Sequence, residues 1–165
     1  MEILYINCCI SSSLITVGDL GFDFYRTDFQ NQSIAYSLDE GKTWTKYAGN
    51  PVLKTPNLKD FRDPKVFRYQ DHWIMCAVQP WDHKVSFYKS SDLITWQHLS
   101  DFGPAAAISG VWECPDLFPL TLNGNECWVL LVSLNPGGLC GSGTQYFVGD
   151  FVCTATRVCG IAPND

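Results

Sequence analysis

The chain has 165 residues, of which 46% are hydrophobic and 17% are charged. This composition provides enough apolar surface for a buried core and excludes a chain that is disordered by composition. The formal net charge is −6 and the sequence has no basic stripe, so nucleic acid is not expected as a partner. No apolar run approaches the length of a membrane span, so a membrane is not expected as a partner either.

The first 29 residues are predicted to be a separate N-terminal segment. Their apolar patches at 3–6 and 14–17 are broken by polar residues, and Glu2 is the only early charge. A secretory signal begins with basic residues and continues into one unbroken apolar run. This segment is therefore not a convincing signal peptide.

Short alternating apolar runs follow, separated by clusters of Gly, Pro, Asn and Asp, and no helical period of useful length occurs. Strands are predicted at 33–37, 73–78, 85–90, 128–132 and 144–148. A unit of about 50 residues with about four strands is typical of a propeller blade. The fold class is therefore predicted to be all-β, an incomplete β-propeller of about two blades, with a third copy beginning at 144–148.

The first predicted hairpin turn has the sequence Ser37-Leu-Asp-Glu-Gly-Lys-Thr-Trp44. Asp39 can accept hydrogen bonds from turn amides, Gly41 can take a positive φ, and Trp44 can pack back on the hairpin. The segment resembles the Asp-box turn of several β-propellers. A looser copy, Ser91-Asp-Leu-Ile-Thr-Trp96, lacks the glycine and is one residue shorter from its aspartate to its tryptophan. Both turns are expected to be structural.

Two further stretches share one pattern, Phe-Arg-Asp-Pro-Lys-Val-Phe at 61–67 and Val-Trp-Glu-Cys-Pro-Asp-Leu-Phe at 111–118. Each puts an acidic residue just before a proline and then continues as an apolar run. Equivalent modules around one axis would direct Asp63 and Glu113 to one place. Glycoside hydrolysis needs such a carboxyl pair, one to protonate the leaving oxygen and one to attack the anomeric carbon or activate water. The alternative is that both motifs are structural turns.

Eight cysteines occur at positions 8, 9, 76, 114, 127, 140, 153 and 159, without a Cys-x-x-Cys pair. This spacing does not indicate a zinc site, and no metal or cofactor is expected. Most of the cysteines are expected to be buried free thiols. The glycine-rich stretch 135–143 has no phosphate-binding lysine and is interpreted as a connection between blades.

The two acid–proline motifs resemble two of the three hallmark motifs of glycoside hydrolase family 32, which contains invertases, inulinases and levanases. The match is supported by Gln32-Ser-Ile-Ala-Tyr-Ser-Leu-Asp39, Asn135-Pro-Gly-Gly138 and the run from Gly141 to Phe151. The resemblance implies that residues 30–151 are part of a five-bladed β-propeller catalytic domain. Residues 1–29 and the tail 152–165 diverge from the family pattern.

The resemblance also implies cleavage of β-fructofuranosyl linkages in sucrose, inulin or levan, with retention through a covalent intermediate. Glu113 matches the general acid/base, and Asp63 matches the transition-state stabiliser that holds fructose hydroxyls. Arg62 matches the neighbouring substrate-binding position that orders the acidic cluster. The implied partner is a fructose-containing carbohydrate, and the implied location is extracellular.

The third hallmark, a Trp-Met-Asn-Asp-Pro-Asn-like segment that carries the nucleophile, has no counterpart here, since the only Asp-Pro pair is Asp63-Pro64. The chain is therefore expected to be a fragment that is nearly inactive alone. Two alternatives remain open. One is a non-catalytic sugar-binding fragment, in which Trp81, Trp112 and Trp128 either line a groove or pack within the blades. The other is an arabinan- or xylan-cleaving five-bladed glycosidase, against which the Glu-Cys-Pro-Asp motif argues.

Overall fold

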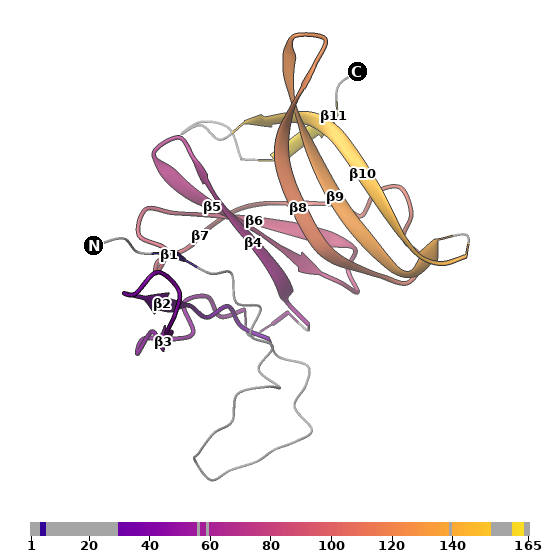
Figure 1. Cartoon of the computed structure of the whole chain (residues 1–165). Coiled ribbons are helices and arrows are strands. Elements are labelled where there is room, and N and C mark those ends of the chain that lie inside the picture. The colour runs from indigo at the N-terminus through magenta and orange to yellow at the C-terminus, as the bar shows by residue number, and fades with distance from the viewer. Residues whose placement is uncertain are drawn as a thin grey trace.

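The computed structural model describes residues 4–5, 30–55, 57–58, 60–138, 140–152 and 160–163. All regular structure in these ranges is β-strand, and the strands form three antiparallel sheets (Figure 1). The small sheet has the order β1-β2-β3, and the two larger sheets have the orders β4-β5-β6-β7 and β11-β10-β9-β8. The all-β prediction is thus confirmed, and each larger sheet has the four strands of a propeller blade.

The small sheet consists of β1 (Leu4–Tyr5), β2 (Ala35–Ser37) and β3 (Thr45–Lys46). The first larger sheet consists of β4 (Arg62–Tyr69), β5 (His72–Gln79), β6 (Lys84–Ser90) and β7 (Gln97–Phe102). The second consists of β8 (Val111–Leu122), β9 (Asn125–Gly138), β10 (Gly141–Val152) and β11 (Gly160–Pro163).

One prediction about the repeat is wrong. Residues 144–148 do not begin a third copy, because they belong to β10, which pairs with β9 and β11 inside the second larger sheet. The additional partial sheet lies at the other end of the chain, where β2 pairs with β1 and β3. Strands at 33–37 and 144–148 look alike in sequence because alternation marks a strand without indicating which sheet it joins.

The main core lies between the two larger sheets, which face each other with β8 beside β4 and β5 (Figure 1). The first sheet contributes Ile74, Cys76, Val78, Val85 and Phe87, and the second contributes Trp112, Leu117, Trp128, Leu130, Val132, Leu134 and Phe151. Fully burying one such side chain contributes roughly 1.5–3 kcal/mol before the entropy cost of ordering it. This packing fixes β4 against β8, and both acid–proline motifs lie on these two strands.

Strand β5 is buried on both faces. Ile74, Cys76 and Val78 point toward the second sheet, whereas Met75 and Ala77 pack with Phe61 and Tyr88 on the other side. A strand covered on both faces reads as a continuous apolar run rather than as an alternation. This explains the unbroken apolar stretch within the strand that the sequence predicts at 73–78.

The turn from Ser37 to Trp44 forms as predicted. Asp39 Oδ1 accepts from Thr43 N at 2.8 Å, Gly41 has φ 84°, and Trp44 Nε1 donates to Gly41 O at 2.9 Å. These hydrogen bonds hold the pKa of Asp39 at about 2, chiefly through the Thr43 backbone and hydroxyl groups and then through Ser37. The turn is therefore stabilised most strongly when Asp39 is ionised.

The second copy of this turn begins one residue earlier than predicted. Ser90, rather than Ser91, donates its hydroxyl to Asp92 Oδ1 at 2.9 Å, and Trp96 Nε1 donates to Leu93 O at 3.2 Å. Leu93 takes φ 67°, the conformation for which a glycine was expected. The loop closes around a non-glycine residue because Ser90 and Asp92 satisfy four amide groups of the turn, those of residues 92–95.

The cysteine prediction is only partly right. Cys76, Cys114, Cys127 and Cys140 are free thiols, but only Cys76 is buried, while Cys114 and Cys140 are exposed. Cys8, Cys9, Cys153 and Cys159 lie outside the described residues. Burial raises the pKa of the Cys76 thiol to about 12, which makes it inert at neutral pH.

Candidate active site

Both acid–proline motifs interrupt their strands with a β-bulge. The register of β4 with β5 shifts between Arg62 and Lys65, and that of β8 with β9 shifts between Glu113 and Asp116. The residue before each proline has a positive φ, 54° at Asp63 and 47° at Cys114. A bulge turns the side chains of its strand in new directions, and bulges are common next to active sites.

The bulges correct the sequence alignment of the two motifs. Asp63 and Cys114 occupy equivalent positions because each precedes its proline and has the positive φ. Glu113 is therefore equivalent to Arg62, and not to Asp63 as the motif comparison assumed. Pro64 and Pro115 lie 51 residues apart, in line with the predicted unit of about 50 residues, but the two acids lie one position apart within the repeated unit.

Equivalent residues of the two sheets contact each other. Arg62 Nη2 donates to Glu113 Oε1 at 2.9 Å, and Cys114 N donates to Asp63 Oδ2 at 3.0 Å. The Arg62 guanidinium also lies 3.8 Å from Asp63 Oδ2, through Nε. The two predicted catalytic acids thus meet on one guanidinium, at the junction of β4 and β8.

A third carboxylate belongs to this cluster. Asp60 Oδ2 lies 3.8 Å from Arg62 Nη1 and accepts a hydrogen bond from Trp81 Nε1. The side chains of Arg62, Asp63 and Glu113 are 22%, 23% and 27% exposed. One cation thus neutralises part of the charge of three carboxylates that remain accessible to a ligand. The sequence analysis missed Asp60, although an acid two residues before Arg62 was a visible signal.

The pKa of the Cys114 thiol reflects both its desolvation and the negative charges of the neighbouring cluster. Desolvation raises the pKa of its thiol, and the negative charges of Asp63 and Glu113 raise it further. An exposed cysteine with a raised pKa is mostly protonated at neutral pH and is a poor nucleophile. Cys114 therefore does not replace the missing nucleophile.

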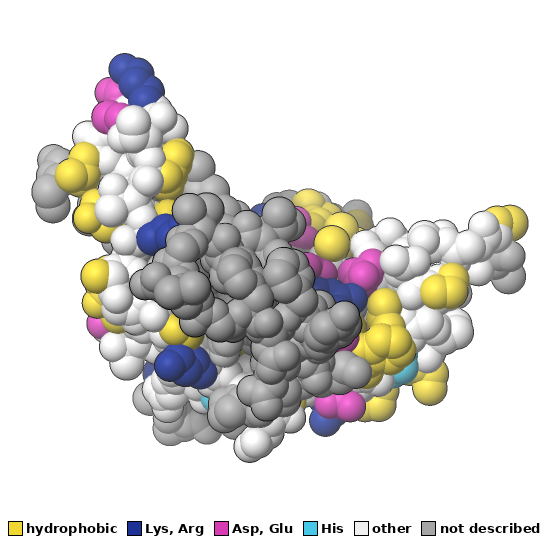
Figure 2. Space-filling view, turned by 90° about the horizontal axis from the view of Figure 1, so that it is seen from below, with side chains coloured by type: hydrophobic (Ala, Val, Ile, Leu, Met, Phe, Trp, Pro, Cys, Tyr) yellow, Lys and Arg dark blue, Asp and Glu magenta, His cyan; other side chains and the backbone are white. Residues whose placement is uncertain are grey.

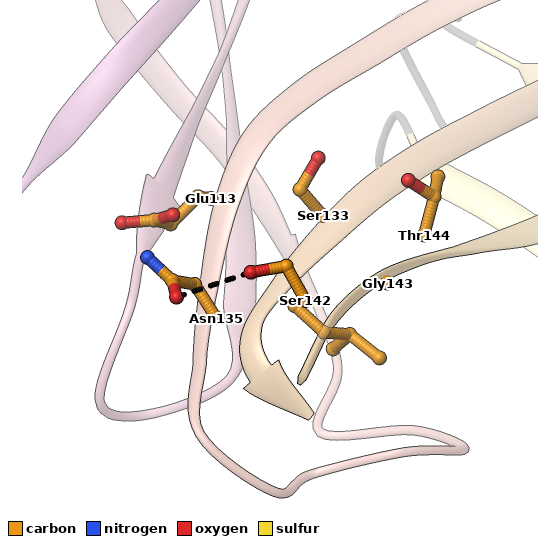
Figure 3. Close-up of a pocket in the computed structure, with 7 residues that line it drawn as sticks. Glu113, Ser133, Asn135, Ser142, Gly143 and Thr144 are labelled. Carbon is orange, nitrogen blue, oxygen red and sulfur yellow. Dashed lines mark hydrogen bonds between the residues drawn. The ribbon is translucent and has the colours of Figure 1, made fainter. Parts of the chain in front are cut away.

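A cavity of about 290 Å³ opens beside Glu113. It is lined by Glu113, Ser133, Leu134, Asn135, Ser142, Gly143 and Thr144. Ser133 pairs with Glu113 on one side and with Thr144 on the other, so three neighbouring strands each contribute one of these polar side chains. Figure 3 shows carboxylate, amide and hydroxyl groups around this opening, and such groups can exchange hydrogen bonds with sugar hydroxyls.

Asn135 is held in place within this cavity. Ser142 Oγ donates to Asn135 Oδ1 at 3.3 Å, as the dashed line in Figure 3 marks. The prediction that residues 135–143 connect two blades is wrong, because they include the end of β9 and the start of β10, which pair within one sheet. Residues of this stretch also line the cavity. Asp63 and Arg62 are not among the lining residues, so within the described residues the two acids share a guanidinium but not this cavity.

The three tryptophans proposed for a sugar groove separate into two groups. Trp112 is fully buried and Trp128 is 8% exposed, and both belong to the core between the larger sheets. Trp81 is 61% exposed and lies in the turn between β5 and β6. The packing interpretation is therefore right for Trp112 and Trp128, and a surface role stays open for Trp81.

Among the described residues, no group of three or more His, Cys, Asp or Glu side chains could hold a metal ion. No helix in this part of the chain is long and apolar enough to cross a membrane. The charged cluster on β4 and β8 is the strongest candidate site because it combines ionisable side chains, partial exposure and an adjoining cavity.

Comparison with known proteins shows the family to which the chain is related. The model of the glycosyl hydrolases family 32 N-terminal domain matches residues 7–159. The chain is 51% identical over 133 residues to a levanase of Bacillus subtilis and 48% identical over 138 residues to an extracellular exo-inulinase of Aspergillus niger. These matches cover 76% and 75% of the chain but only 19% and 26% of the relatives. The chain thus spans between a fifth and about a quarter of their length.

Solved structures agree with this placement. The exo-inulinase of Aspergillus awamori matches with a TM-score of 0.73 and 38% identity, over 97% of this chain and 31% of that one. A fructofuranosidase of Schwanniomyces occidentalis complexed with fructose matches with a TM-score of 0.72 and 38% identity, over 84% and 27%. The strands of this chain are therefore arranged as in part of these enzymes.

Proposed function

Because this chain belongs to glycosyl hydrolase family 32, we propose that it forms part of the catalytic domain of an enzyme that cleaves β-fructofuranosyl linkages. The observation that carries the proposal is the contact of Asp63 and Glu113 with one guanidinium at the β4–β8 junction. Two carboxyl groups at a partly exposed site can supply two of the functions that glycoside hydrolysis uses, proton transfer to the leaving oxygen and stabilisation of the transition state. The substrate class is sucrose, inulin or levan, in line with the names of the relatives.

In this proposal Glu113 is the general acid/base. Its carboxyl group borders the cavity and protonates the leaving oxygen, and it then removes a proton from the incoming water. Arg62 holds Glu113 through the 2.9 Å contact from Nη2, which limits the orientations of the carboxyl group. A fixed proton donor is worth more than a mobile one because the reacting atoms must be aligned.

Asp63 is proposed to hold fructose hydroxyls and to stabilise the positive charge that develops on the sugar ring. One of its oxygens is occupied by Cys114 N, which fixes the side chain across the junction of the sheets. A carboxylate can accept strong hydrogen bonds from hydroxyl groups, and the nearby Arg62 guanidinium helps to keep this one in position. Arg62 thus serves both acids.

A chimera with the A. niger exo-inulinase tests this assignment. The segment of that enzyme matched by this chain is replaced by the corresponding residues of the chain, and fructose release from sucrose, inulin and levan is measured. We expect activity, and we expect Glu113→Gln in the chimera to reduce kcat about a hundred- to ten-thousandfold, since an amide cannot donate the proton. The matched control is Glu40→Gln, an exposed glutamate in the turn after β2. Equal activity of the two variants would contradict the assignment.

A non-catalytic fructan-binding role is the second candidate, favoured by the lack of a nucleophile motif in this sequence. It predicts saturable binding of fructose oligomers to the chain, measured by calorimetry, together with a chimera that binds but releases no fructose. Activity of the chimera that depends on Glu113 would exclude it. We also propose an extracellular location, because the exo-inulinase relatives are described as extracellular.

A further inference from the structure

The turn between β5 and β6 carries an exposed tryptophan next to the charged cluster. Trp81 is 61% exposed, but its indole nitrogen donates a hydrogen bond to Asp60 Oδ2. Most exposed side chains change rotamer freely, whereas this ring has one edge attached to a carboxylate that itself contacts Arg62. Its apolar faces are therefore presented to solvent in a limited set of orientations.

Two hydrogen bonds connect this turn to the start of β8 and to the residue just before it. Trp112 N donates to Pro80 O at 3.2 Å, and His83 Nε2 donates to Gly110 O at 2.8 Å. These contacts lie on either side of Trp81 in the chain, so the turn is fixed across the same junction that holds Arg62 and Glu113. Because the turn is already ordered, binding of a ligand to this ring costs little additional conformational entropy.

The contacts of Arg62 give the order of groups along the cluster. Around the edge of a planar guanidinium the nitrogens follow the order Nε, Nη2, Nη1. Nε faces Asp63, Nη2 faces Glu113 and Nη1 faces Asp60, which in turn holds Trp81. Glu113 therefore lies between Asp63 on one side and the Asp60–Trp81 pair on the other.

This order defines two sides of the scissile bond. Asp63 holds the fructosyl unit and Glu113 protonates the oxygen that leaves, so the group beyond Glu113 is the one that departs. We propose that Trp81 is a stacking platform for the sugar on the leaving-group side, an inference that rests on the proposed function. Aromatic rings bury the apolar faces of sugars, and a ring with a satisfied N–H does so without leaving a polar group unpaired.

Figure 2 agrees with a binding surface of mixed character. On the face that it shows, acidic and basic side chains lie next to one another near the middle, and hydrophobic side chains border them. A sugar presents hydroxyl groups at its edge and C–H groups on its faces, so it can use both kinds of surface at once. Trp81 itself has charged neighbours, because it contacts Asp60, which in turn contacts Arg62.

The test compares a short and a long ligand on the full chain. Fructose and fructosylnystose are titrated by calorimetry into the wild type, Trp81→Ala and Trp81→Phe. We expect Trp81→Ala to weaken fructosylnystose binding about tenfold and to leave fructose binding unchanged, because fructose alone occupies only the Asp63 side. Trp81→Phe keeps a ring and should retain most of the affinity. Leu38→Ala, an exposed apolar residue in the turn after β2, is the control and should change neither ligand.

Three outcomes would contradict the proposal that Trp81 is a stacking platform. If Trp81→Ala binds fructosylnystose as the wild type does, or weakens both ligands equally, Trp81 does not bind the leaving-group sugar. If the wild type binds fructosylnystose no more tightly than fructose, Trp81 is not a stacking platform, whereas the proposed fructose site is still supported. Binding of neither ligand by the wild type would overturn the proposed sugar site together with the platform.

Discussion

At the scale of single residues, Arg62 decides how the acids of the site are arranged. Its guanidinium contacts Asp60, Asp63 and Glu113 through three different nitrogens. A lysine would carry the same charge but could not hold three carboxylates at fixed angles, since its ammonium group has no planar fork. The geometry of the site therefore depends on arginine in particular.

Cys114 provides a measurable test of this electrostatic arrangement. Desolvation and the charges of Asp63 and Glu113 raise the pKa of its thiol, so little thiolate is present at neutral pH. We expect Asp63→Asn to accelerate alkylation of Cys114 by iodoacetamide, because removing a negative charge favours the thiolate. Mass spectrometry of the native protein follows the reaction. Labelling of exposed Cys140 in the same sample is the control and should keep its rate. An unchanged or slower reaction at Cys114 would contradict the argument.

At the scale of elements, the close approach of Gly110 to the end of β9 holds β8 in place. A Cβ at Gly110 would lie 1.5 Å from Pro136 O, and its φ is 72°. We expect Gly110→Ala to reduce the free energy of unfolding by more than about 3 kcal/mol, measured by urea denaturation. The control is Gly124→Ala in the turn between β8 and β9, where φ is 82° but no atom lies within 4 Å. Only the backbone conformation should cost energy there, about 1–2 kcal/mol. Equal losses would show that the contact with Pro136 is not limiting.

The pKa values of the aspartates in the two turns predict how the stability of the protein changes at low pH. Hydrogen bonds in the folded turns lower the pKa of Asp39 and of Asp92 from 3.8 to about 2. A group with a depressed folded pKa stabilises the protein above its unfolded pKa, and this contribution disappears as the pH falls through the folded pKa. Stability should therefore decrease between about pH 4 and pH 2. Thermal unfolding across this range should show a shallower decrease in the Asp39→Asn, Asp92→Asn double variant. A slope equal to that of the wild type would exclude the turns as its source.

At the scale of the whole molecule, the outer face of the second larger sheet exposes several large apolar side chains of the described residues. Leu120, Leu122, Tyr146 and Val148 are all exposed there, Tyr146 by 68%. Exposed apolar patches promote association. We expect the chain to self-associate as its concentration rises, as measured by sedimentation velocity. The variant Leu122→Lys, Tyr146→Lys should stay monomeric at higher concentrations. Leu38→Lys is exposed but outside this face and should behave as the wild type does. Equal behaviour of both variants would exclude this face.

The sequence was sufficient for five of the strands, for the first aspartate turn and for the family, but not for the register. The runs at 73–78 and 85–90 predict β5 and β6 because their apolar patterns are local. The placement of 144–148 failed because alternation carries no information about which sheet a strand joins. The two bulges were also not predictable, since a positive φ before proline at Asp63 and Cys114 depends on the neighbouring strands.

The candidate site could be predicted only in part, because local motifs can be read from the sequence and contacts between strands cannot. Asp63, Glu113 and Arg62 stand in short motifs, so their residue types could be recognised from the chain alone. Asp60, Asn135 and Ser142 join the site or its cavity only through pairing across strands and sheets. Trp81 could not be separated from Trp112 and Trp128 by sequence, because burial decides which tryptophan packs and which one is exposed.

The contact between Arg62 and Glu113 has a consequence for how such a domain can arise from duplicated blades. Two identical copies would place the same side chain on both sides of this junction, and two arginines or two glutamates at 2.9 Å would repel each other. The copies can meet closely here only after one of them has changed the sign of its charge. Asymmetry at this single position thus lets neighbouring blades adhere, and it also leaves a carboxylate beside a guanidinium at the proposed site.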